Sequence, residues 1–217
     1  MKTDRKRRQF VLGLGALIVP AGVSALLDPT PKQGAGPFYP DPLPLDDDND
    51  LTRVDGDSRR ALGEIADLSG RLLDIAGRPL AGRRIEIWQC DANGRYRHPY
   101  DQGSEDPDPG FQGFGATVTD ADGRYRFRTI RPVPYPGRTP HIHIAIPHGH
   151  GPRFTTQMYV AGEPRNDRDF LYRRIPADLR ARVVAEFRPS PNPNIRYSAS
   201  FDIILGQDHI GEWKSRA

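Results

Sequence analysis

Two histidines stand two positions apart, at His141 and His143, in a short apolar segment of the chain. Isoleucine occupies the alternate positions from 142 to 146, and this period of two is typical of a β-strand. Alternate side chains of a strand point to the same side, so both imidazoles are expected to face one place. Imidazole is the commonest metal ligand among protein side chains. The segment therefore predicts either part of a metal site or a pair of hydrogen-bonded histidines.

A second pair repeats this spacing at His148 and His150. These residues stand between Pro147 and Pro152 in a glycine-rich stretch. Such a stretch favours a solvent-exposed loop, in which no neighbouring group fixes the orientation of an imidazole. We interpret this pair as loop residues without a role in the site.

Two tyrosines occupy settings in which the backbone is constrained. Tyr96 follows the turn signal DANG at 91–94, and Tyr135 stands between two prolines. A tyrosine beside a turn is most often an amphipathic surface residue, and that interpretation holds for each one alone. Proline fixes its own φ angle, however, so the loop can present Tyr135 at a defined point six residues before His141.

The elements around these residues follow from a second pattern. From residue 61 onward, short apolar alternations are separated by turn signals about every eight to twelve residues, which predicts an all-β fold with a β-sandwich core. The DADG turn at 120–123 is expected to close a hairpin between its flanking strands. One short helix is expected over 177–187, because Pro176 precedes an apolar face with helical spacing. The strands are expected at 70–75, 84–90, 117–119, 124–129, 141–146, 154–160 and 195–205.

Residues 1–25 combine a start rich in Lys and Arg with an apolar run, and they contain RRQFVL. The pattern is similar to a twin-arginine signal, which exports folded proteins. Pro20 and several glycines interrupt the run, which is shorter than the ~20 residues that a membrane span requires. We therefore expect removal of this segment, a periplasmic or extracellular location, and no stable membrane span afterwards. Residues 26–60, rich in Pro, Gly and Asp, are expected to form an extended arm ahead of one domain, 61–217.

The charge of the chain depends on that first segment. The 217 residues include 31 Lys or Arg and 28 Asp or Glu, for a net charge of +3. Residues 1–25 contribute +4, from five basic residues and Asp4, so the remainder is near −1. That remainder lacks the basic footprint of a nucleic-acid-binding protein. Cys90 is the only cysteine, so no internal disulfide can form, and we expect it to be a small buried residue on a strand.

Several motifs occur in an order that resembles the catalytic core of the intradiol ring-cleavage dioxygenases, most closely their protocatechuate-cleaving branch. They are IEIWQCDANGRYRH at 85–98, DADGRYRFRTIRPVPYP at 120–136, RTPHIHI at 138–144 and TTQMY at 155–159. GAGPFYP at 34–40 and DNDLTRV at 48–54 are similar to the N-terminal arm of that family. The resemblance spans about residues 33–162.

The resemblance implies a function for particular residues. One non-haem Fe(III) ion per chain would be held by Tyr96, Tyr135, His141 and His143. The catalytic residues would be Arg138 and Tyr135, and the substrate would contact Gln157, Trp88 and Arg138. Hard anionic phenolates favour iron(III), whereas two histidines and a carboxylate suit iron(II).

The implied reaction joins a small aromatic diol with O2 and opens the ring between its two hydroxylated carbons, which gives a muconate-type diacid. The family's behaviour implies that Tyr135 leaves the metal and accepts a substrate proton, while Tyr96 stays. Gly137 stands where the family commonly has tryptophan, and the loop that follows is shorter. This departure changes one wall of the pocket, so the identity of the catechol stays open, as does assembly into a homo-oligomer.

Two other classes of function fit part of the sequence. An exported, transthyretin-like β-sandwich that binds a ligand without catalysis would explain the strands and turns, but it predicts no metal and gives no reason for either tyrosine. An iron(II) extradiol or cupin-type dioxygenase would use His141 and His143, but no carboxylate stands in a comparably constrained motif as a third ligand. Bound iron would exclude the binding module without catalysis. Ring cleavage between the two hydroxylated carbons would exclude the iron(II) dioxygenase.

Overall fold

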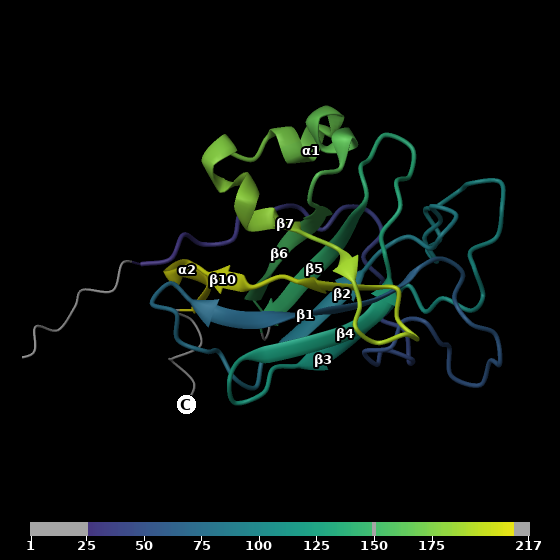
Figure 1. Cartoon of the computed structure of the whole chain (residues 1–217), viewed down its shortest axis with the longest axis horizontal. Helices are drawn as coiled ribbons and strands as arrows, with labels where there is room; N and C mark the ends of the chain where they lie inside the picture. The colour runs from purple at the N-terminus through teal and green to yellow at the C-terminus, as the bar shows by residue number, and fades with distance from the viewer. Residues whose placement is uncertain (1–25, 149–150, 211–217) are drawn as a thin grey trace, which may run out of the picture.

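The computed structural model describes residues 26–148 and 151–210. Its strands form two mixed five-stranded sheets, and the helical elements are short, which confirms the predicted all-β class (Figure 1). The first sheet has the order β10-β1-β9-β8, and β4 pairs with the opposite edge of β1. The second sheet has the order β3-β2-β5-β6-β7, which places β5 at its centre.

The bounds of these elements are as follows. The first sheet consists of β1 (Ile65–Asp74), β4 (Arg124–Ile130), β8 (Arg188–Pro189), β9 (Tyr197–Ser200) and β10 (Ile203–Leu205). The second consists of β2 (Arg84–Trp88), β3 (Phe114–Val118), β5 (His141–His148), β6 (Gly151–Val160) and β7 (Val184–Ala185). The helical elements are η1 (Pro164–Arg168), α1 (Phe170–Arg173), η2 (Ala177–Val183) and α2 (Gln207–Ile210).

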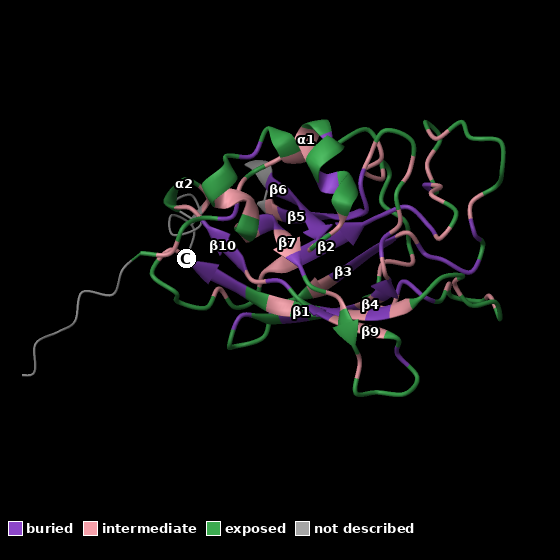
Figure 2. Ribbon diagram, turned by 45° about the horizontal axis from the view of Figure 1, so that its top comes forward, coloured by how far each residue is buried: buried purple, intermediate pink, exposed green. Residues whose placement is uncertain are grey.

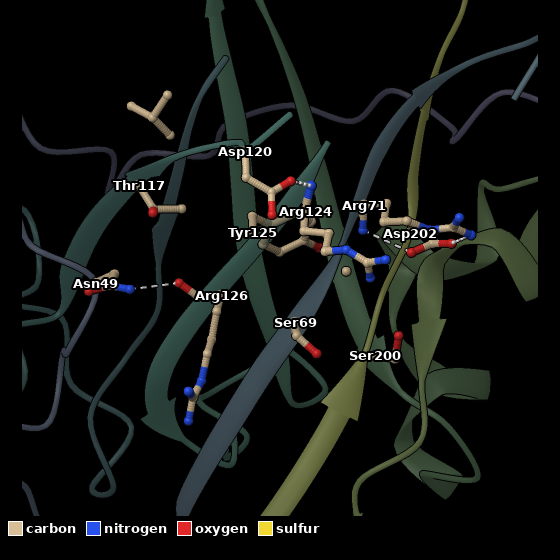
Figure 3. Close-up of a pocket in the computed structure, with 12 residues that line it drawn as sticks. Asn49, Ser69, Arg71, Thr117, Asp120, Arg124, Tyr125, Arg126, Ser200 and Asp202 are labelled. Carbon is tan, nitrogen blue, oxygen red and sulfur yellow. Dashed lines mark hydrogen bonds and ion pairs between the residues drawn. The ribbon is translucent and has the colours of Figure 1, made fainter. Parts of the chain in front are cut away.

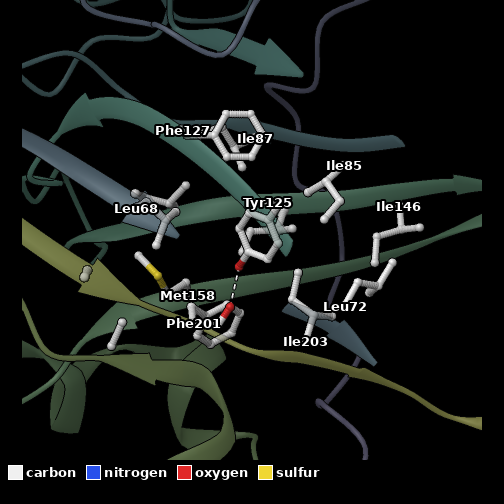
Figure 4. Packing of buried hydrophobic residues seen from close by; sticks show 14 of the residues in the cluster. Leu68, Leu72, Ile85, Ile87, Tyr125, Phe127, Ile146, Met158, Phe201 and Ile203 are labelled. Atoms are coloured by element: carbon white, nitrogen blue, oxygen red, sulfur yellow. Dashed lines mark hydrogen bonds between the residues drawn. The ribbon is translucent and has the colours of Figure 1, made fainter. Parts of the chain in front are cut away.

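The hydrophobic core draws its side chains from both sheets (Figure 4). Residues of β4 alternate between exposed and buried, so that Tyr125 and Phe127 point inward. They join Leu68 of β1 and meet Ile87 and Ile144 of the second sheet in one buried cluster. Burial of one such side chain contributes about 1.5–3 kcal/mol, so the shared core fixes one sheet against the other. Figure 2 shows the buried strands inside and the exposed loops around them.

The predicted hairpin around 120–123 is wrong. The turn itself forms, since the Gly123 N–H donates to the Asp120 carbonyl at 3.0 Å. The strands on either side do not pair, because β3 pairs with β2 in the second sheet and β4 pairs with β1 in the first. Turn chemistry specifies a local reversal of the chain. Which strand a segment pairs with depends on the sheet that buries its apolar face. Here the turn carries the chain from the second sheet, at β3, to the first sheet, at β4.

The predicted helix over 177–187 is wrong in type and in length, because the 3₁₀ helix η2 ends at Val183 and the chain then enters β7. β7 pairs in parallel with the end of β6, with Val184 opposite Tyr159. A β-branched residue suits such a position, and Val183 is buried in a cluster with Tyr159. The apolar spacing therefore indicates burial on one side and not an α-helix. The sequence pattern also misses η1, α1 and α2.

Two further boundaries need correction. The expected strand at 195–205 is divided into β9 and β10, which pair with β1 at separate places. The expected loop at 147–153 is mostly strand, because β5 includes His148 and β6 begins at Gly151. The side chain of His148 and all of His150 lie outside the described residues, so the interpretation of that pair stays a prediction.

Residues 26–60 contain no helix or strand apart from an isolated bridge at Asp50. The segment lies against β6, where the Gln33 N–H donates to the Thr155 carbonyl at 2.8 Å. The expected signal at 1–25 lies outside the described residues, and the division at residue 60 stays a prediction. Nowhere in the described part of the chain is a helix both long and apolar enough to cross a bilayer.

Candidate active site

β5 presents its two histidines on one side, as the alternation predicts. Their side chains are 1 % and 2 % exposed, and their Nε2 atoms lie 3.2 Å apart. The Nδ1 atom of His141 lies 2.6 Å from the Thr139 carbonyl; a carbonyl only accepts, so Nδ1 carries the proton and Nε2 keeps its lone pair. The buried Nδ1 of His143 has no hydrogen-bond partner. That ring is oriented by Trp88, on which it stacks at 4.8 Å and 7°.

Tyr96 reaches the same place from the loop that follows β2. The Asp91 carboxylate closes the preceding turn by accepting two backbone N–H groups. The Asp101 carboxylate accepts the Tyr96 N–H at 2.6 Å, which fixes the backbone of the tyrosine itself. The ring stacks on Phe38 at 4.4 Å between centroids. The tyrosine is 3 % exposed, and its hydroxyl has no hydrogen-bond partner.

Tyr135 comes from a four-residue turn between β4 and β5. The Arg138 N–H donates to the Tyr135 carbonyl at 2.9 Å, and Gly137 has a φ of 81°. Proline in the second position and a positive φ in the third are typical of a type II turn, so glycine at 137 is required by the backbone. The Tyr135 ring lies 5.4 Å from the Tyr96 ring and 5.5 Å from the His141 ring, centroid to centroid. The two tyrosines and the histidines of β5 therefore converge.

Burial favours the neutral form of all four groups. It lowers the pKa of His141 to about 4 and that of His143 well below its usual range. It also raises the pKa of Tyr96 well above the usual value and raises the pKa of Tyr135. Both imidazoles are therefore uncharged at neutral pH, and both phenols ionise only beside a strong positive charge.

This set of donors fits a metal ion. Two nitrogen atoms that each lie about 2.1 Å from one metal ion, with an angle of about 90° at the metal, are about 3 Å apart. The Nε2 atoms of His141 and His143 are separated by 3.2 Å. A buried polar atom without a partner costs free energy, and the unpartnered Tyr96 hydroxyl would find its partner in the same ion. The metal's charge would ionise the phenols, much as it ionises a coordinating thiol.

Carboxylates are not part of this set. Among residues 26–148 and 151–210, no group of three or more His, Cys, Asp or Glu side chains could hold a metal ion. A site of two histidines and one carboxylate, which is typical of iron(II) oxygenases, is therefore not built around His141 and His143. This result weighs against the iron(II) alternative.

Arg138 lies beside Tyr135, held by two further side chains. Its Nη1 donates to the Tyr135 hydroxyl at 3.3 Å, its Nη2 to Gln157 Oε1 at 2.5 Å, and its Nε to Asp169 Oδ2 at 2.8 Å. The side chains of Arg138 and Asp169 are 8 % and 0 % exposed. Burial alone would lower the pKa of Arg138, but the hydrogen bond and the charge of Asp169 raise it. The guanidinium therefore keeps its positive charge next to the converging tyrosines.

Trp88 and Gln157 flank His143 on the two neighbouring strands. Trp88 pairs with His143 from β2, and Gln157 pairs with it from β6. Both side chains are buried, Trp88 against the imidazole and Gln157 against Arg138. The structure thus places both in supporting positions, and their predicted contact with substrate stays a prediction. Cys90 is buried as expected, two residues beyond the end of β2.

Asp169 is the residue of the candidate site that the sequence pattern does not reveal. It stands 31 positions after Arg138 in the chain. Its Oδ1 accepts the N–H groups of Leu171 and Tyr172 and so caps α1. An Asp before a short helix is a recognisable N-cap signal, but nothing local indicates that its other oxygen holds Arg138.

A surface pocket of about 290 Å³ opens beside the site, and the side of it nearest the ligands is formed by Tyr135 and Arg138. A larger pocket, of about 520 Å³, lies over β1 and β4 and shares no residue with the site (Figure 3). Its arginines each have a carboxylate partner, as in the pair of Arg71 with Asp202 at 3.0 Å. The smaller pocket is therefore the one of these two that reaches the candidate site, and it does so at Tyr135 and Arg138.

Comparison with known proteins agrees with this geometry. A family model described as Dioxygenase matches residues 35–207. The protocatechuate 3,4-dioxygenase beta chain of Burkholderia cepacia is 38 % identical over 171 residues, 74 % of this chain and 73 % of that one. A hydroxyquinol 1,2-dioxygenase of Rhodococcus opacus is 27 % identical over 238 residues, 96 % of this chain and 76 % of that one.

Among solved structures, the dioxygenase domain of a carbohydrate-binding fusion protein from Streptomyces sp. SirexAA-E superposes with a TM-score of 0.60 at 31 % identity. The match covers 82 % of this chain and 99 % of that domain. The family match extends over most of the chain and includes all four converging residues. This chain belongs to the intradiol ring-cleavage dioxygenase family.

Proposed function

We propose that this protein is a non-haem Fe(III)-dependent dioxygenase with one iron per chain. It cleaves a catechol-type ring between the two hydroxylated carbons with O2, and the product is a muconate-type diacid. The observation that carries the proposal is the convergence of two tyrosines and two histidines from separate parts of the chain. The residues that hold the iron are Tyr96, Tyr135, His141 and His143.

When bound, the iron supplies Lewis-acid chemistry and a template that orients the substrate. The two tyrosines then differ in their surroundings. Tyr96 is buried under Phe38, whereas Tyr135 is only partly buried and lines the pocket of about 290 Å³. A catechol entering through that pocket meets Tyr135 first. Tyr135 is therefore the tyrosine placed to act on the substrate, and its phenolate oxygen would accept a proton from the substrate hydroxyl.

Arg138 holds a fixed positive charge at this point. Its Nη1 lies 3.3 Å from the Tyr135 hydroxyl, so the guanidinium faces the oxygen atoms that exchange protons. The buried partners of Arg138 keep it from turning away when substrate binds. A preorganised cation in a site of low dielectric stabilises negative charge as it develops in the transition state. Arg138 thus acts both in substrate binding and in the reaction.

Labelled oxygen tests this proposal. With ¹⁸O2 and catechol or protocatechuate, we expect a muconate whose two new carboxylates carry label, apart from exchange with water during hydrolysis of the cyclic anhydride. Cleavage outside the diol would give a yellow semialdehyde. That product, or an activity that requires iron(II), would overturn the assignment of the tyrosines as ligands.

We also propose that the protein is exported after folding, with residues 1–25 as a removable twin-arginine-type signal. Export of a folded chain allows the iron to be loaded inside the cell. Replacement of both Arg7 and Arg8 by Lys should leave the unprocessed protein in the cytoplasmic fraction. Processing and export of that variant at the normal rate would contradict the proposal.

A further inference from the structure

The pocket beside Tyr135 extends from the candidate iron ligands to the 3₁₀ helix η1. Tyr135 and Arg138 line it from the turn before β5, and Arg165 and Arg168 line it from η1. Its lining contains three arginines but a single acidic residue, Asp169. The charged groups that the turn and η1 contribute to this pocket therefore decide which ligand it favours.

The three arginines are not compensated equally. Arg138 is paired with the buried Asp169 at 2.8 Å, and Arg165 is paired with Glu163 at 3.1 Å. Arg168 is exposed and has no carboxylate partner within the described part of the chain. The pocket thus has, on its η1 side, a guanidinium that no carboxylate of the described chain neutralises.

We infer that this pocket receives the ring substituent of the substrate and that the substituent is a carboxylate. Arg168 is then the residue that determines specificity. A guanidinium offers parallel N–H donors that match the two oxygens of a carboxylate. A hydroxyl, halogen or alkyl substituent cannot accept such a pair of hydrogen bonds and carries no negative charge to attract the guanidinium. The inference rests on the proposed function, because it requires the diol to be bound at Tyr135.

The geometry of the pocket agrees with this division of roles. The diol end is rigid, because Arg138 is held by Gln157 and Asp169 and the turn is closed by Gly137. The η1 side contributes a solvent-exposed arginine on a short helical turn, and this side chain can adapt to the position of the carboxylate. The side chains that act on the diol must be held in fixed positions. Selection of a negatively charged substituent requires only a cation that can reach it.

The test compares 3,4-dihydroxybenzoate with catechol, which differ only in the carboxylate. In Arg168→Gln, the ratio of kcat/KM for dihydroxybenzoate to kcat/KM for catechol should fall about tenfold, as expected for loss of a hydrogen bond to a charged group. Arg173→Gln is the matched control, because it removes an equally exposed arginine that does not line the pocket. In that control the ratio should stay within about twofold of wild type. Increasing salt should weaken dihydroxybenzoate binding in wild type more than in Arg168→Gln.

Binding measured by calorimetry under nitrogen, where no ring can open, separates this inference from the proposed function. If neither catechol is cleaved in air, the proposed function fails, but the two affinities still decide the role of Arg168. Equal losses of affinity for both ligands in Arg168→Gln, no loss for either, or the same loss in Arg173→Gln would each overturn the inference. Circular dichroism of both variants should match wild type, since both side chains are exposed.

Discussion

Replacement of Asp169 by Asn tests the buried ion pair that fixes Arg138. Asn keeps an oxygen that can cap α1, where Asp169 Oδ1 accepts the N–H groups of Leu171 and Tyr172 at 2.9 Å. The second oxygen becomes an amide NH2 group. It then faces two donors, the Nε of Arg138 and the N–H of Thr139, which lie 2.8 and 3.0 Å from Oδ2 in the native protein. The substitution is nearly isosteric, so its effect reports charge and hydrogen bonding.

The expected loss of stability follows from burial. The Arg138 side chain is 8 % exposed and would keep its charge without a counter-ion. Breaking a buried pair by removing one partner costs about 3–5 kcal/mol. For a folded unit of this size, 1 kcal/mol corresponds to about 2–4 °C in Tm, so Tm should fall by about 6–20 °C at pH 7. Glu186→Gln, in an exposed pair with Arg188, should change Tm little, because solvent screens such a pair, and it serves as the control.

The effect should depend on pH. Burial alone would raise the pKa of Asp169, but hydrogen bonds from the backbone of Tyr172 and Thr139 and from Arg138 outweigh it and lower the pKa. A carboxylate with a lowered folded-state pKa stabilises the protein above its unfolded value of about 3.9, and that stability is lost as the pH falls through the folded-state value. The difference between wild type and Asp169→Asn should therefore be complete at pH 7 and shrink in acid.

Thermal unfolding of wild type, Asp169→Asn, Arg138→Leu and the double variant would measure this coupling. The double variant should lose less stability than the two single variants added together, because it leaves no unpaired charge. A loss of Tm below about 2 °C at pH 7, or additive effects, would refute the view that Asp169 holds Arg138. Iron content should stay at the wild-type level, since neither side chain is a proposed ligand.

Other predictions concern the proposed ligands, Arg138 and the packing of β1. His143→Ala should lose bound iron, as measured by elemental analysis. Tyr135→Phe should keep its iron but shift the visible absorption band that arises from charge transfer between tyrosinate and metal. A red-brown colour that is unchanged in Tyr135→Phe would exclude Tyr135 as a ligand. Arg138→Leu should lower kcat and kcat/KM alike, by about 10²; an effect on KM alone would limit Arg138 to substrate binding. Gly70→Ala should unfold at a lower urea concentration than wild type, because its Cβ would lie 1.9 Å from the Phe201 carbonyl oxygen. Such overpacking costs about 1–3 kcal/mol of unfolding free energy. An unchanged urea midpoint would contradict this packing.

Local patterns in the sequence predict much of the site. The alternation around His141 and His143 indicates both the strand and the side on which the imidazoles lie, because strand periodicity depends on neighbouring residues only. The two tyrosines are different. Their surroundings are turns and prolines, which indicate rigid loops but not where these loops lead, so their role follows only from the family resemblance.

The failures have a common physical cause. The turn at 120–123 is predicted correctly, but pairing of the strands around it depends on which sheet buries them, a property of residues far apart in the chain. Asp169 is likewise recognisable as an N-cap, whereas its contact with Arg138 exists only in the folded protein. The apolar residues at 177–187 indicate burial on one side. Part of this segment nevertheless forms the strand β7, because it pairs with the edge of β6.

The turn from Tyr135 to Arg138 has a consequence for the way this protein can diversify. Its first residue is a proposed metal ligand, and its last is the arginine proposed to act on the substrate. An insertion within the turn would break its closing hydrogen bond from the Arg138 N–H to the Tyr135 carbonyl. The longer loop that the family commonly has here must therefore fix its tyrosine and its arginine by other contacts. A Cβ at Gly137 would meet no atom within 4 Å, and only its φ of 81° excludes a larger residue. A differently folded loop that carried a larger side chain at this place would fill open space at the pocket wall, and so it would change which ligands the pocket accepts.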